Sequence, residues 1–428
     1  MTAQSNHNAT DYLIASKQAE IQNLEYFLQM GQLVVMVSDL VHSLQKERGA
    51  SNVFIASKGQ QFQNPLIQLS QSTNQQIQLF QETLTQIHPQ LRSHAGNSRL
   101  LNRIAYVLHG LAGLTSVRQQ VQALILSTEQ ATEHYSDIVS GLLAIVFETA
   151  DAAVDPTIAR ILVAMFNLMH GKELAGQERA LGAAGFAVGS FSTTQVERLQ
   201  HLIDAQERCF ELFLEFGHPA ALQQWQQHAS QAYLIEIERL RRIILTQETA
   251  RIPHTQPSDH WFALLTQRID DLKIVETAIE VHLQQVCQHT LHDAQRTLEQ
   301  QQHLIGQLQH GQQDSFSVFL SDDESSTLQS ILVDRFHPDR LSPQLGRSVF
   351  ELVQHQAQRL QQMQDELDAA RQALEERKLQ QKAKALLIKH RQMTEDEAHR
   401  LLRQMAMDQG KKITEVAKNL IDMADVWR

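Results

Sequence analysis

The chain has 428 residues, which is too long for one compact core and favours two or three domains. Proline (8) and glycine (17) are scarce and aromatic residues make up 6%, a composition that favours helices over sheets. The net charge is −11, but eleven basic against seven acidic residues give residues 378–428 a charge of +4, leaving −15 for the rest. A polyanion partner is therefore excluded from most of the chain and indicated only for its C-terminal end.

No feature of the sequence points to secretion or to a membrane. The N-terminus is polar and lacks the basic start and apolar core of a signal peptide. The longest apolar stretch, Ile161–Met169, is interrupted by Asn167 and is shorter than the roughly 18 residues that a membrane span needs. Cys209 and Cys287 are far apart and form no CxxC motif, which suits a reducing compartment. We expect a soluble cytoplasmic protein with no membrane partner.

Helical periodicity runs through nearly the whole chain and no segment alternates like a strand. Prolines divide the first 290 residues into long amphipathic segments, as expected for helical bundles with short connections. We expect helix breaks at Pro65, Pro89, Pro156, Pro219, Pro253–Pro257, and Pro338 with Pro343. We divide the chain into an N-terminal extension with the start of the first helix (1–29), a first helical domain (30–290), a connector (291–365) and a C-terminal module (366–428).

Three arginines lie on apolar helical lines, where a core residue is expected. Arg48 continues the line Val34, Val37, Val41, Leu44 and is followed by Ser51 and Ile55. Arg179 shares a face with Ala175, Ala183 and Phe186, and Arg241 lies on the line Leu234, Ile237, Ile244. Arg239 and Arg242 fall off that line and are expected in solvent. The tetrapeptide Gln177-Glu-Arg-Ala180 resembles Lys46-Glu-Arg-Gly49, which suggests two related bundles.

A buried guanidinium keeps its charge and must meet an anion. One possible partner is a carboxylate such as Glu47 or Glu178 from the opposite bundle. The alternative is a small planar anion, because Gly49, Ala50, Ala180 and Gly182 leave room beside the arginines. Guanidinium groups match the oxygens of nitrate, nitrite or a carboxylate in bidentate geometry.

The segments Leu44–Phe54, Gly176–Phe186 and Trp261–Lys273 resemble the NIT family of nitrate- and nitrite-sensing domains. The resemblance covers roughly residues 30 to 285. It implies two four-helix bundles that hold the anion between them through arginines. Arg48 and Arg179 lie in the matching motifs, and the helical line adds Arg241 as the third candidate nitrate ligand.

The connector combines an acidic, serine-rich loop with a helix. Ser315–Ser326 reads as the loop. A 3-4 repeat of Val353, Leu360, Met363, Leu367, Ala370 and Leu374 then predicts a coiled-coil-like helix able to form a homodimer.

Residues 383–427 predict three short helices. The first contains Ala385-Leu-Leu387 and ends near Gln392, and Thr394-Glu-Asp-Glu397 forms a capping box for the second. The second carries Ala398, Leu401, Leu402 and Met405 and ends at Gly410, and the third begins at Thr414 and carries Val416, Ala417, Leu420, Ile421 and Trp427. We expect a small three-helix bundle.

These segments, with Leu402–Ala406 and Ile413–Ile421, resemble the ANTAR family, the RNA-binding output of antiterminators. The resemblance implies binding to a pair of leader-mRNA hairpins, whose unstacked loop bases are readable and whose flanking phosphates attract basic side chains. Each lysine alone could be a solvated side chain; as a cluster, the basic residues favour RNA. The candidate RNA-binding residues are Lys382, Lys389, Arg391, Arg403, Lys411 and Lys412.

Taken together, the chain resembles nitrate-responsive transcription antiterminators, except over residues 290–350. It is expected to be all-α: paired four-helix bundles, a coiled-coil-like helix and a small three-helix bundle. Nitrate or nitrite would be a ligand, and no cofactor or metal is expected. The 21 histidines include no HExxH motif, and no nucleophile–base pair is evident, so we do not expect an enzyme. The alternative is an ANTAR-type antiterminator controlled by a protein partner rather than an anion.

Overall fold

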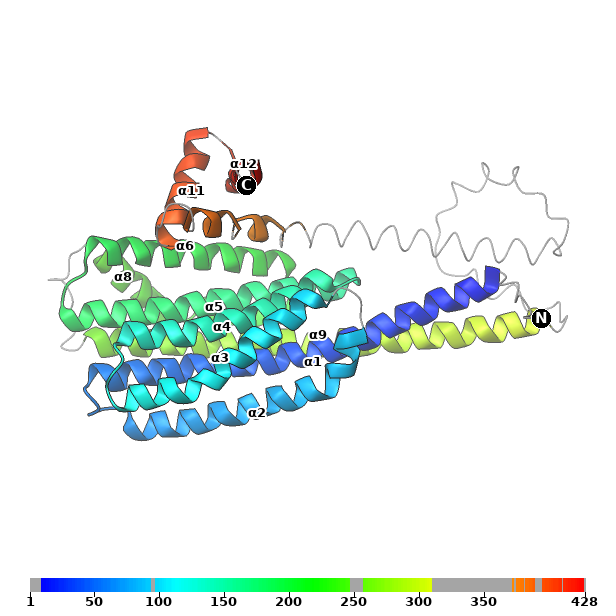
Figure 1. Cartoon of the computed structure of the whole chain (residues 1–428), viewed down its shortest axis with the longest axis horizontal. Helices are drawn as coiled ribbons and strands as arrows, with labels where there is room; N and C mark the ends of the chain where they lie inside the picture. The colour runs from blue at the N-terminus through cyan, green and yellow to red at the C-terminus, as the bar shows by residue number, and fades with distance from the viewer. Residues whose placement is uncertain are drawn as a thin grey trace. The chain divides into compact units, whose positions relative to one another are not determined.

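The computed structural model describes residues 9–93, 97–246, 257–309, 372, 375–380, 382–388, 395–409 and 411–426, and every structural statement below concerns these residues. Their regular elements are all α-helices, which confirms the predicted all-α fold (Figure 1). The predicted loop at 315–326, the break at Pro338 and Pro343, and all six residues of the predicted coiled-coil repeat from Val353 to Leu374 lie outside the described residues. The chain divides into two compact units, residues 1–28 with 287–366 and residues 29–286 with 367–428.

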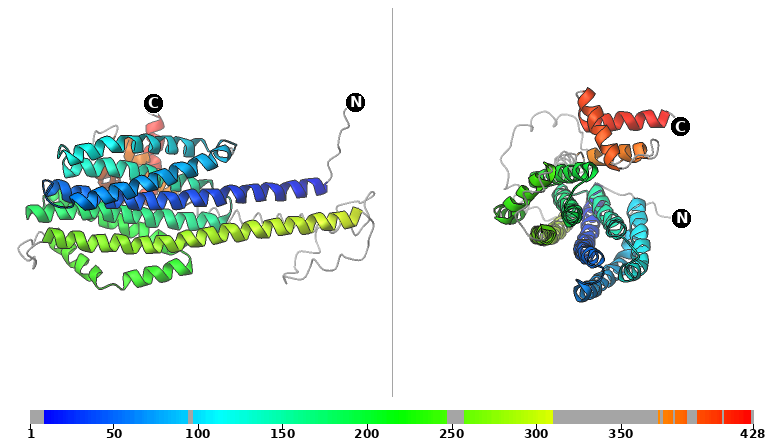
Figure 2. Two further views of the ribbon diagram at one scale, coloured as in Figure 1. Left: turned by 90° about the horizontal axis from the view of Figure 1, so that it is seen from below. Right: turned by 90° about the vertical axis from the view of Figure 1, so that its left-hand side faces the viewer.

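The first unit contains the ends of the two longest helices, α1 (Ala9–Ala56) and α9 (Pro257–Gln309). Residues 9–28 of α1 and the C-terminal part of α9 run side by side in both Figures 1 and 2. Leu24, Phe27 and Cys287 are buried there. Apolar contacts between two long helices therefore hold the described part of this unit together.

The second unit contains two helical bundles. Residues 29–56 of α1 pack with α2 (Gln63–Ser93), α3 (Ser98–Gln122) and α4 (Thr128–Ala152). The other bundle consists of α5 (Pro156–Val188), α6 (Thr193–Phe216), α8 (Tyr233–Leu245) and α9, with the short α7 (Pro219–Ala229) packed through Trp225 on α6. The end-on view in Figure 2 shows these groups, blue to cyan and green to yellow, next to each other.

Of the five described prolines, four lie at the start of a helix, where the sequence predicts a break. Pro156 and Pro219 occupy the first turns of α5 and α7, and Pro257 begins α9. A proline is favoured there because its missing N–H has no partner within the helix anyway. The predicted break at Pro89 is wrong, since this residue lies inside α2. It is only one turn from the end of that helix, where the loss of a backbone hydrogen bond disturbs few residues.

Helix α1 contains the one described stretch apolar enough to cross a membrane, an 18-residue window within Asp11–Ala56, and 56% of that window is buried inside the protein. Val34, Val37 and Leu40 are fully buried. The expectation from the sequence rested on Ile161–Met169 alone. The apolar stretch of α1 covers the core of a helical bundle, because its side chains face other helices.

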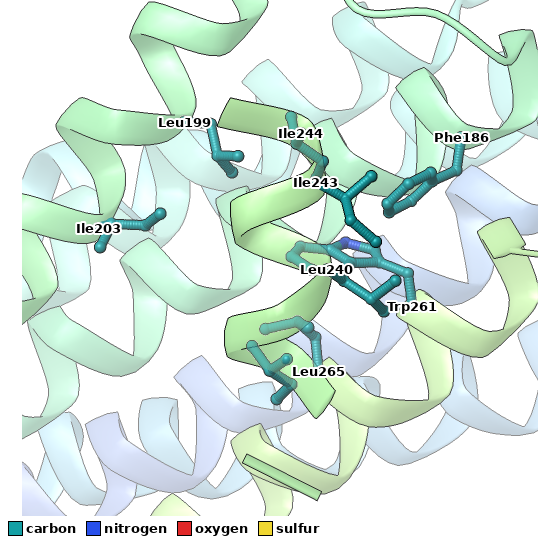
Figure 3. Packing of buried hydrophobic residues seen from close by; sticks show 9 residues of the cluster. Phe186, Leu199, Ile203, Leu240, Ile243, Ile244, Trp261 and Leu265 are labelled. Atoms are coloured by element: carbon teal, nitrogen blue, oxygen red, sulfur yellow. The ribbon is translucent and has the colours of Figure 1, made fainter. Parts of the chain in front are cut away.

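Trp261 joins α9 to α5 in the second bundle (Figure 3). The indole is fully buried beside Phe186 and Leu240, and its Nε1 donates a hydrogen bond to the backbone carbonyl of Arg179 at 3.2 Å. A Cβ at Gly182 would lie 2.3 Å from Nε1, so only glycine admits the ring at this point. The tryptophan therefore fixes the backbone that carries Arg179.

The C-terminal module has its own small core. It comprises the helical residues 375–380 and 382–388, together with α11 (Glu395–Gln409) and α12 (Ile413–Val426). Its buried residues are Ala383, Leu387, Ala398, Leu402, Ala406, Val416 and Ala417, with Leu401, Met405, Leu420 and Ile421 packed against them. Ala385 lies in the first helix, as predicted, and is exposed because it lies two positions from both Ala383 and Leu387. Thr394, Gly410 and Trp427 lie outside the described residues.

Candidate anion site and RNA-binding module

Arg48 is 1% exposed and points from α1 toward α5, as its apolar line predicts. Its Nη1 and Nη2 donate to the two carboxylate oxygens of Glu173 at 2.5 and 3.1 Å, and Nη1 also donates to the Ser136 hydroxyl at 2.7 Å. One of the two partners predicted from the sequence was a carboxylate such as Glu47 or Glu178. The carboxylate bonded to Arg48 is instead that of Glu173, which was not among the predicted partners.

Arg179 is also buried but has no carboxylate bonded to it among the described residues. Its Nη1 donates to the Thr266 hydroxyl at 2.9 Å and its Nη2 to the backbone carbonyl of Gln45 at 3.1 Å. The guanidinium lies 4.7 Å from the centre of the Phe262 ring. Burial, followed by repulsion from Arg48, lowers the pKa of Arg179 to about 10. The group stays cationic at neutral pH, in a site that disfavours its charge.

Two glycines bring the arginines together across the bundle interface. A Cβ at Gly49, on α1, would lie 2.6 Å from Nη2 of Arg179. A Cβ at Gly176, on α5, would lie 2.4 Å from Nη2 of Arg48. Each arginine thus lies over a glycine of the opposite helix. Of the small residues noted in the sequence, Gly49 makes this approach, whereas Gly182 makes room for Trp261, and Gly176 is not among them.

The two guanidinium groups and Glu173 leave one positive charge without a bonded counter-ion. Asp270, the other carboxylate that acts on Arg179, is half exposed and pairs with Lys46 at 3.2 Å. A cavity of about 2800 Å³ reaches the site, and its walls include Arg48, Gly49, Glu173, Gly176 and Arg179. The geometry offers access and one net charge to a small monoanion.

Arg241, the third candidate ligand, lies in a different cluster. It is buried, and its Nε and Nη2 each donate at 2.6 Å to the carboxylate of Glu178, while Nη1 pairs with Glu238 at 2.5 Å. Burial acts against its charge, but the attraction of Glu178 prevails and raises the pKa of Arg241. The structure therefore does not bring Arg241 together with Arg48 and Arg179. Arg239 and Arg242 are exposed, as their positions off the helical line predict.

The repeated Glu-Arg dipeptides have equivalent surroundings. Glu47 points into the first bundle, where Arg118 of α3 and the hydroxyl of Tyr135 donate to it at 2.6 and 2.9 Å. Glu178 points into the second bundle, where Arg241 and Gln206 donate to it. The arginine that follows each glutamate faces the other bundle. Arg241 thus corresponds to Arg118, which supports the two related bundles inferred from the echoing motifs.

The candidate RNA-binding residues are only partly described. Lys382, Lys411 and Lys412 are exposed, while Lys389 and Arg391 lie outside the described residues. Arg403, on α11, is half exposed and pairs with Asp204 of α6 at 2.9 Å. Of the four described candidates, three are therefore accessible, and Arg403 forms an ion pair with the sensor.

Helix α6 contacts the C-terminal module through further side chains. Arg400 pairs with Glu197 at 2.7 Å, and the His201 and His399 rings meet edge to face with 4.4 Å between centroids. Burial, followed by repulsion from His201 and nearby cations, lowers the pKa of His399 to about 3. The contact thus places basic residues of the module against acidic residues of α6.

A second contact lies at the start of the module. Arg377 donates to the Asn167 side chain at 2.8 Å, and its guanidinium lies 5.0 Å from the centre of the Phe166 ring on α5. Lys378 pairs with Asp151 of α4 at 3.0 Å. Both bundles of the sensor therefore contact the start of the module.

Within the part of the chain that the structure describes, no group of three or more His, Cys, Asp or Glu residues could hold a metal ion. The clusters of buried ionisable groups are arginine–carboxylate and lysine–carboxylate networks. Networks of this kind are suited to holding charged groups.

Comparison with known proteins agrees with this geometry. Residues 39–284 match the family described as nitrate and nitrite sensing, and residues 368–421 match the ANTAR domain. The chain is 34% identical over 422 residues to the nitrate regulatory protein of Klebsiella oxytoca, covering 98% of this chain and 96% of the relative. The solved structure of the NasR transcription antiterminator is similar at a TM-score of 0.59 and 32% identity, covering 97% of this chain and 99% of that one. These families are regulatory, and the chain belongs to the family of transcription antiterminators that join a nitrate- and nitrite-sensing NIT domain to an ANTAR domain.

Proposed function

We propose that nitrate or nitrite binds between Arg48 and Arg179, one anion per chain. The observation that carries this proposal is a pair of buried guanidinium groups at the wall of a cavity, of which only Arg48 is bonded to a carboxylate. An anion that bridges them replaces their mutual repulsion by charge-assisted hydrogen bonds. Arg241 is left out of the site, because Glu178 and Glu238 already neutralise it.

Isothermal titration of nitrate and nitrite into the full chain tests the site. Each charge-assisted hydrogen bond contributes roughly 1.5–3 kcal/mol, so Arg48→Ala or Arg179→Ala should weaken binding at least tenfold. Arg239→Ala is the control, because this exposed arginine pairs only with Glu236 among the described residues. Unchanged affinity in Arg48→Ala would rule out this pocket. No binding to the wild-type chain would favour control by a protein partner.

We also propose that the C-terminal module binds leader-mRNA hairpins through Lys382, Lys389, Arg391, Arg403, Lys411 and Lys412. Lys411 and Lys412 are exposed and adjacent, which suits contact with phosphates. Affinity for a leader hairpin should fall steeply with salt. Charge reversal of Lys411 and Lys412 should weaken binding further, with circular dichroism unchanged. Equal affinity of wild type and variant would remove these lysines from the interface.

We propose that the contact between α6 and the module is present when no nitrate is bound. The Nη1 of Arg403 is paired with Asp204 in this contact, and the carboxylate offsets the charge that would attract an RNA phosphate. Exposed ion pairs contribute only about 0.2–1 kcal/mol each, so such a contact is easily reversed. Nitrate binding would shift the population toward an undocked module, which lets transcription of nitrate-assimilation genes continue past the terminator.

The coiled-coil-like helix with its repeat from Val353 to Leu374 is proposed to form a homodimer. The protein is proposed to act in the cytoplasm, where the transcript is made. Analytical ultracentrifugation of the full chain, compared with a variant carrying Leu360→Lys and Leu367→Lys, tests the dimer. A monomeric wild-type chain would contradict it.

A further inference from the structure

We propose that Glu173 is an internal competitor of nitrate: its carboxylate occupies the side of Arg48 that the anion requires, and nitrate binds by exchange with it. This inference rests on the proposed nitrate site and concerns what must leave Arg48 before the anion can bridge the two arginines. It assigns to Glu173 a part in setting affinity, distinct from the ligand arginines.

The geometry shows direct competition. Glu173 uses both oxygens on Nη1 and Nη2 of Arg48, at 2.5 and 3.1 Å. Nitrate and a carboxylate present two coplanar oxygens to a guanidinium in the same way, so one edge of the guanidinium holds only one of them. The third acceptor, the Ser136 hydroxyl, is neutral and leaves the carboxylate as the charged group on that edge.

Glu173 also has partners that would remain after the exchange. The side-chain amides of Gln45 and Gln177 donate to its two oxygens at 2.9 and 3.1 Å. A buried carboxylate that loses its arginine without other donors would oppose the exchange strongly. The two amides lower that cost, so nitrate can displace the carboxylate without leaving it unsolvated.

The two arginines differ in a way that gives nitrate an entry point. Arg179 bonds only to the neutral acceptors Thr266 and Gln45 among the described residues. A monoanion therefore meets Arg179 first and then competes with Glu173 for Arg48. Exchange of Glu173 for nitrate on Arg48 follows, because the bridging anion interacts with two guanidinium charges, whereas the carboxylate is bonded to only one.

The test compares nitrate affinity in three variants by isothermal titration of the full chain. Glu173→Gln removes the competing charge and should tighten nitrate binding at least tenfold. Asp270→Asn is the matched control: Asp270 influences Arg179 through space more strongly than Glu173 does and bonds to neither arginine. It removes the same charge without vacating Arg48 and should tighten binding clearly less.

Glu173→Asp distinguishes competition for Arg48 from the effect of the negative charge at residue 173. Aspartate keeps the negative charge, but its side chain is one methylene shorter and cannot hold both nitrogens of Arg48 at the present distances. Nitrate should bind more tightly than to the wild type and less tightly than to Glu173→Gln. Thermal melts with and without nitrate report binding even where a variant is less stable.

The outcomes are distinguishable. Equal tightening in Glu173→Gln and Asp270→Asn would mean that only charge matters and would overturn the exchange. Weaker nitrate binding in Glu173→Gln would show that the carboxylate helps to hold Arg48 for the anion, which also overturns it. If wild type and Glu173→Gln both fail to bind nitrate, the proposed site itself fails.

Discussion

At the scale of single residues, each Glu-Arg dipeptide separates its two charges between two environments. Consecutive residues of a helix point about 100° apart, so one side chain can face its own bundle while the next faces the neighbouring one. Glu47 meets Arg118 inside the first bundle, and Arg48 crosses to Glu173 on α5. The glutamate thus stabilises its bundle while the arginine serves the interface.

This division predicts that Arg241 has a structural role. Arg241→Ala leaves the fully buried Glu178 without its main partner, and breaking a buried ion pair costs about 3–5 kcal/mol. Urea unfolding should show a loss of this size, while the nitrate affinity of the folded fraction stays unchanged. Arg239→Ala, two residues earlier on an exposed face, should change stability by about 0.5 kcal/mol or less. A tenfold loss of nitrate affinity in folded Arg241→Ala would make it a ligand after all.

The same pair predicts an acid dependence. Burial would raise the pKa of Glu178, but the attraction and hydrogen bonds of Arg241 prevail and lower it below its ordinary value of 4.5. The stability from this pair is therefore present above pH 4.5 and is lost as pH falls through the lower folded pKa. The difference in unfolding free energy between wild type and Arg241→Ala should shrink on acidification. A difference that is constant down to about pH 2 would contradict this linkage.

The glycines at the interface allow a sharp test of the anion site. The methyl group in Gly176→Ala would fall on the guanidinium of Arg48 and move it, so nitrate binding should weaken at least tenfold while the helical content stays the same. Gly113→Ala on α3 is the control, because no heavy atom lies within 4 Å of its added carbon. Titration of both variants measures the effect. Normal nitrate affinity in Gly176→Ala would show that the anion does not need Arg48 where it now lies.

The inward direction of the three arginines follows from sequence, but their partners do not. Arg48, Arg179 and Arg241 are buried, because the period of a helix fixes which residues share a face. Glu173 is 125 positions from Arg48 in the chain, and no periodicity shows which carboxylate the packing of α5 on α1 will select. A glutamate within the mostly apolar α5 was the available signal.

At the scale of elements, α6 acts as the docking surface of the module. Glu197, His201 and Asp204 lie three or four residues apart and therefore share one face. That face meets Arg400, His399 and Arg403 of α11. An acidic helix face here is paired with Arg400 and with Arg403, which is one of the proposed RNA-binding residues.

Charge reversal on this face should release the module. In Glu197→Lys with Asp204→Lys, both ion pairs become repulsive, so hairpin affinity without nitrate should rise toward the nitrate-bound value. The control is a single Glu207→Lys on an exposed position of the same helix, which changes the charge of α6 without touching a described ion pair. Filter binding with and without nitrate measures both. If the double variant still needs nitrate, this contact does not restrain the module.

Element boundaries were predictable where a local rule fixes them. Pro156, Pro219 and Pro257 begin helices because the first turn tolerates proline. Pro89 lies within α2 because the helix continues for one more turn, which the local sequence does not reveal. The packing of α11 on α6 depends on side chains some 200 residues apart and could not be predicted from either segment alone.

At the scale of the whole molecule, α5 connects the anion site with the module. Glu173, His170 and Asn167 follow each other at one-turn spacing, and Asn167 accepts a hydrogen bond from Arg377. His170 lies between them, 3.4 Å from the sulfur of Cys209. The cavity wall includes both Arg48 and Arg377. We therefore expect that any coupling between the anion site and the start of the module runs along these two turns of α5.

Coupling of this kind must act in both directions. Two unit charges about 6 Å apart repel by roughly 3 kcal/mol at an effective dielectric of about 20, and a bridging nitrate removes that repulsion. The value matches the usual 1–3 kcal/mol of coupling between allosteric sites. Leader RNA should therefore tighten nitrate binding by the same factor by which nitrate tightens RNA binding. Titrations of each ligand in the presence of the other test this, and equal RNA affinity with and without saturating nitrate would exclude the coupling.

The crossed arrangement of glycines and arginines also limits which substitutions the chain can tolerate at these positions. Gly49 makes room for Arg179 and Gly176 makes room for Arg48, so each helix carries the space that the other helix fills. A bulkier residue at one glycine is tolerable only together with a smaller residue at the arginine some 130 positions away. The two bundles, although they look like copies of one ancestral unit, are therefore no longer free to diverge independently at these four positions.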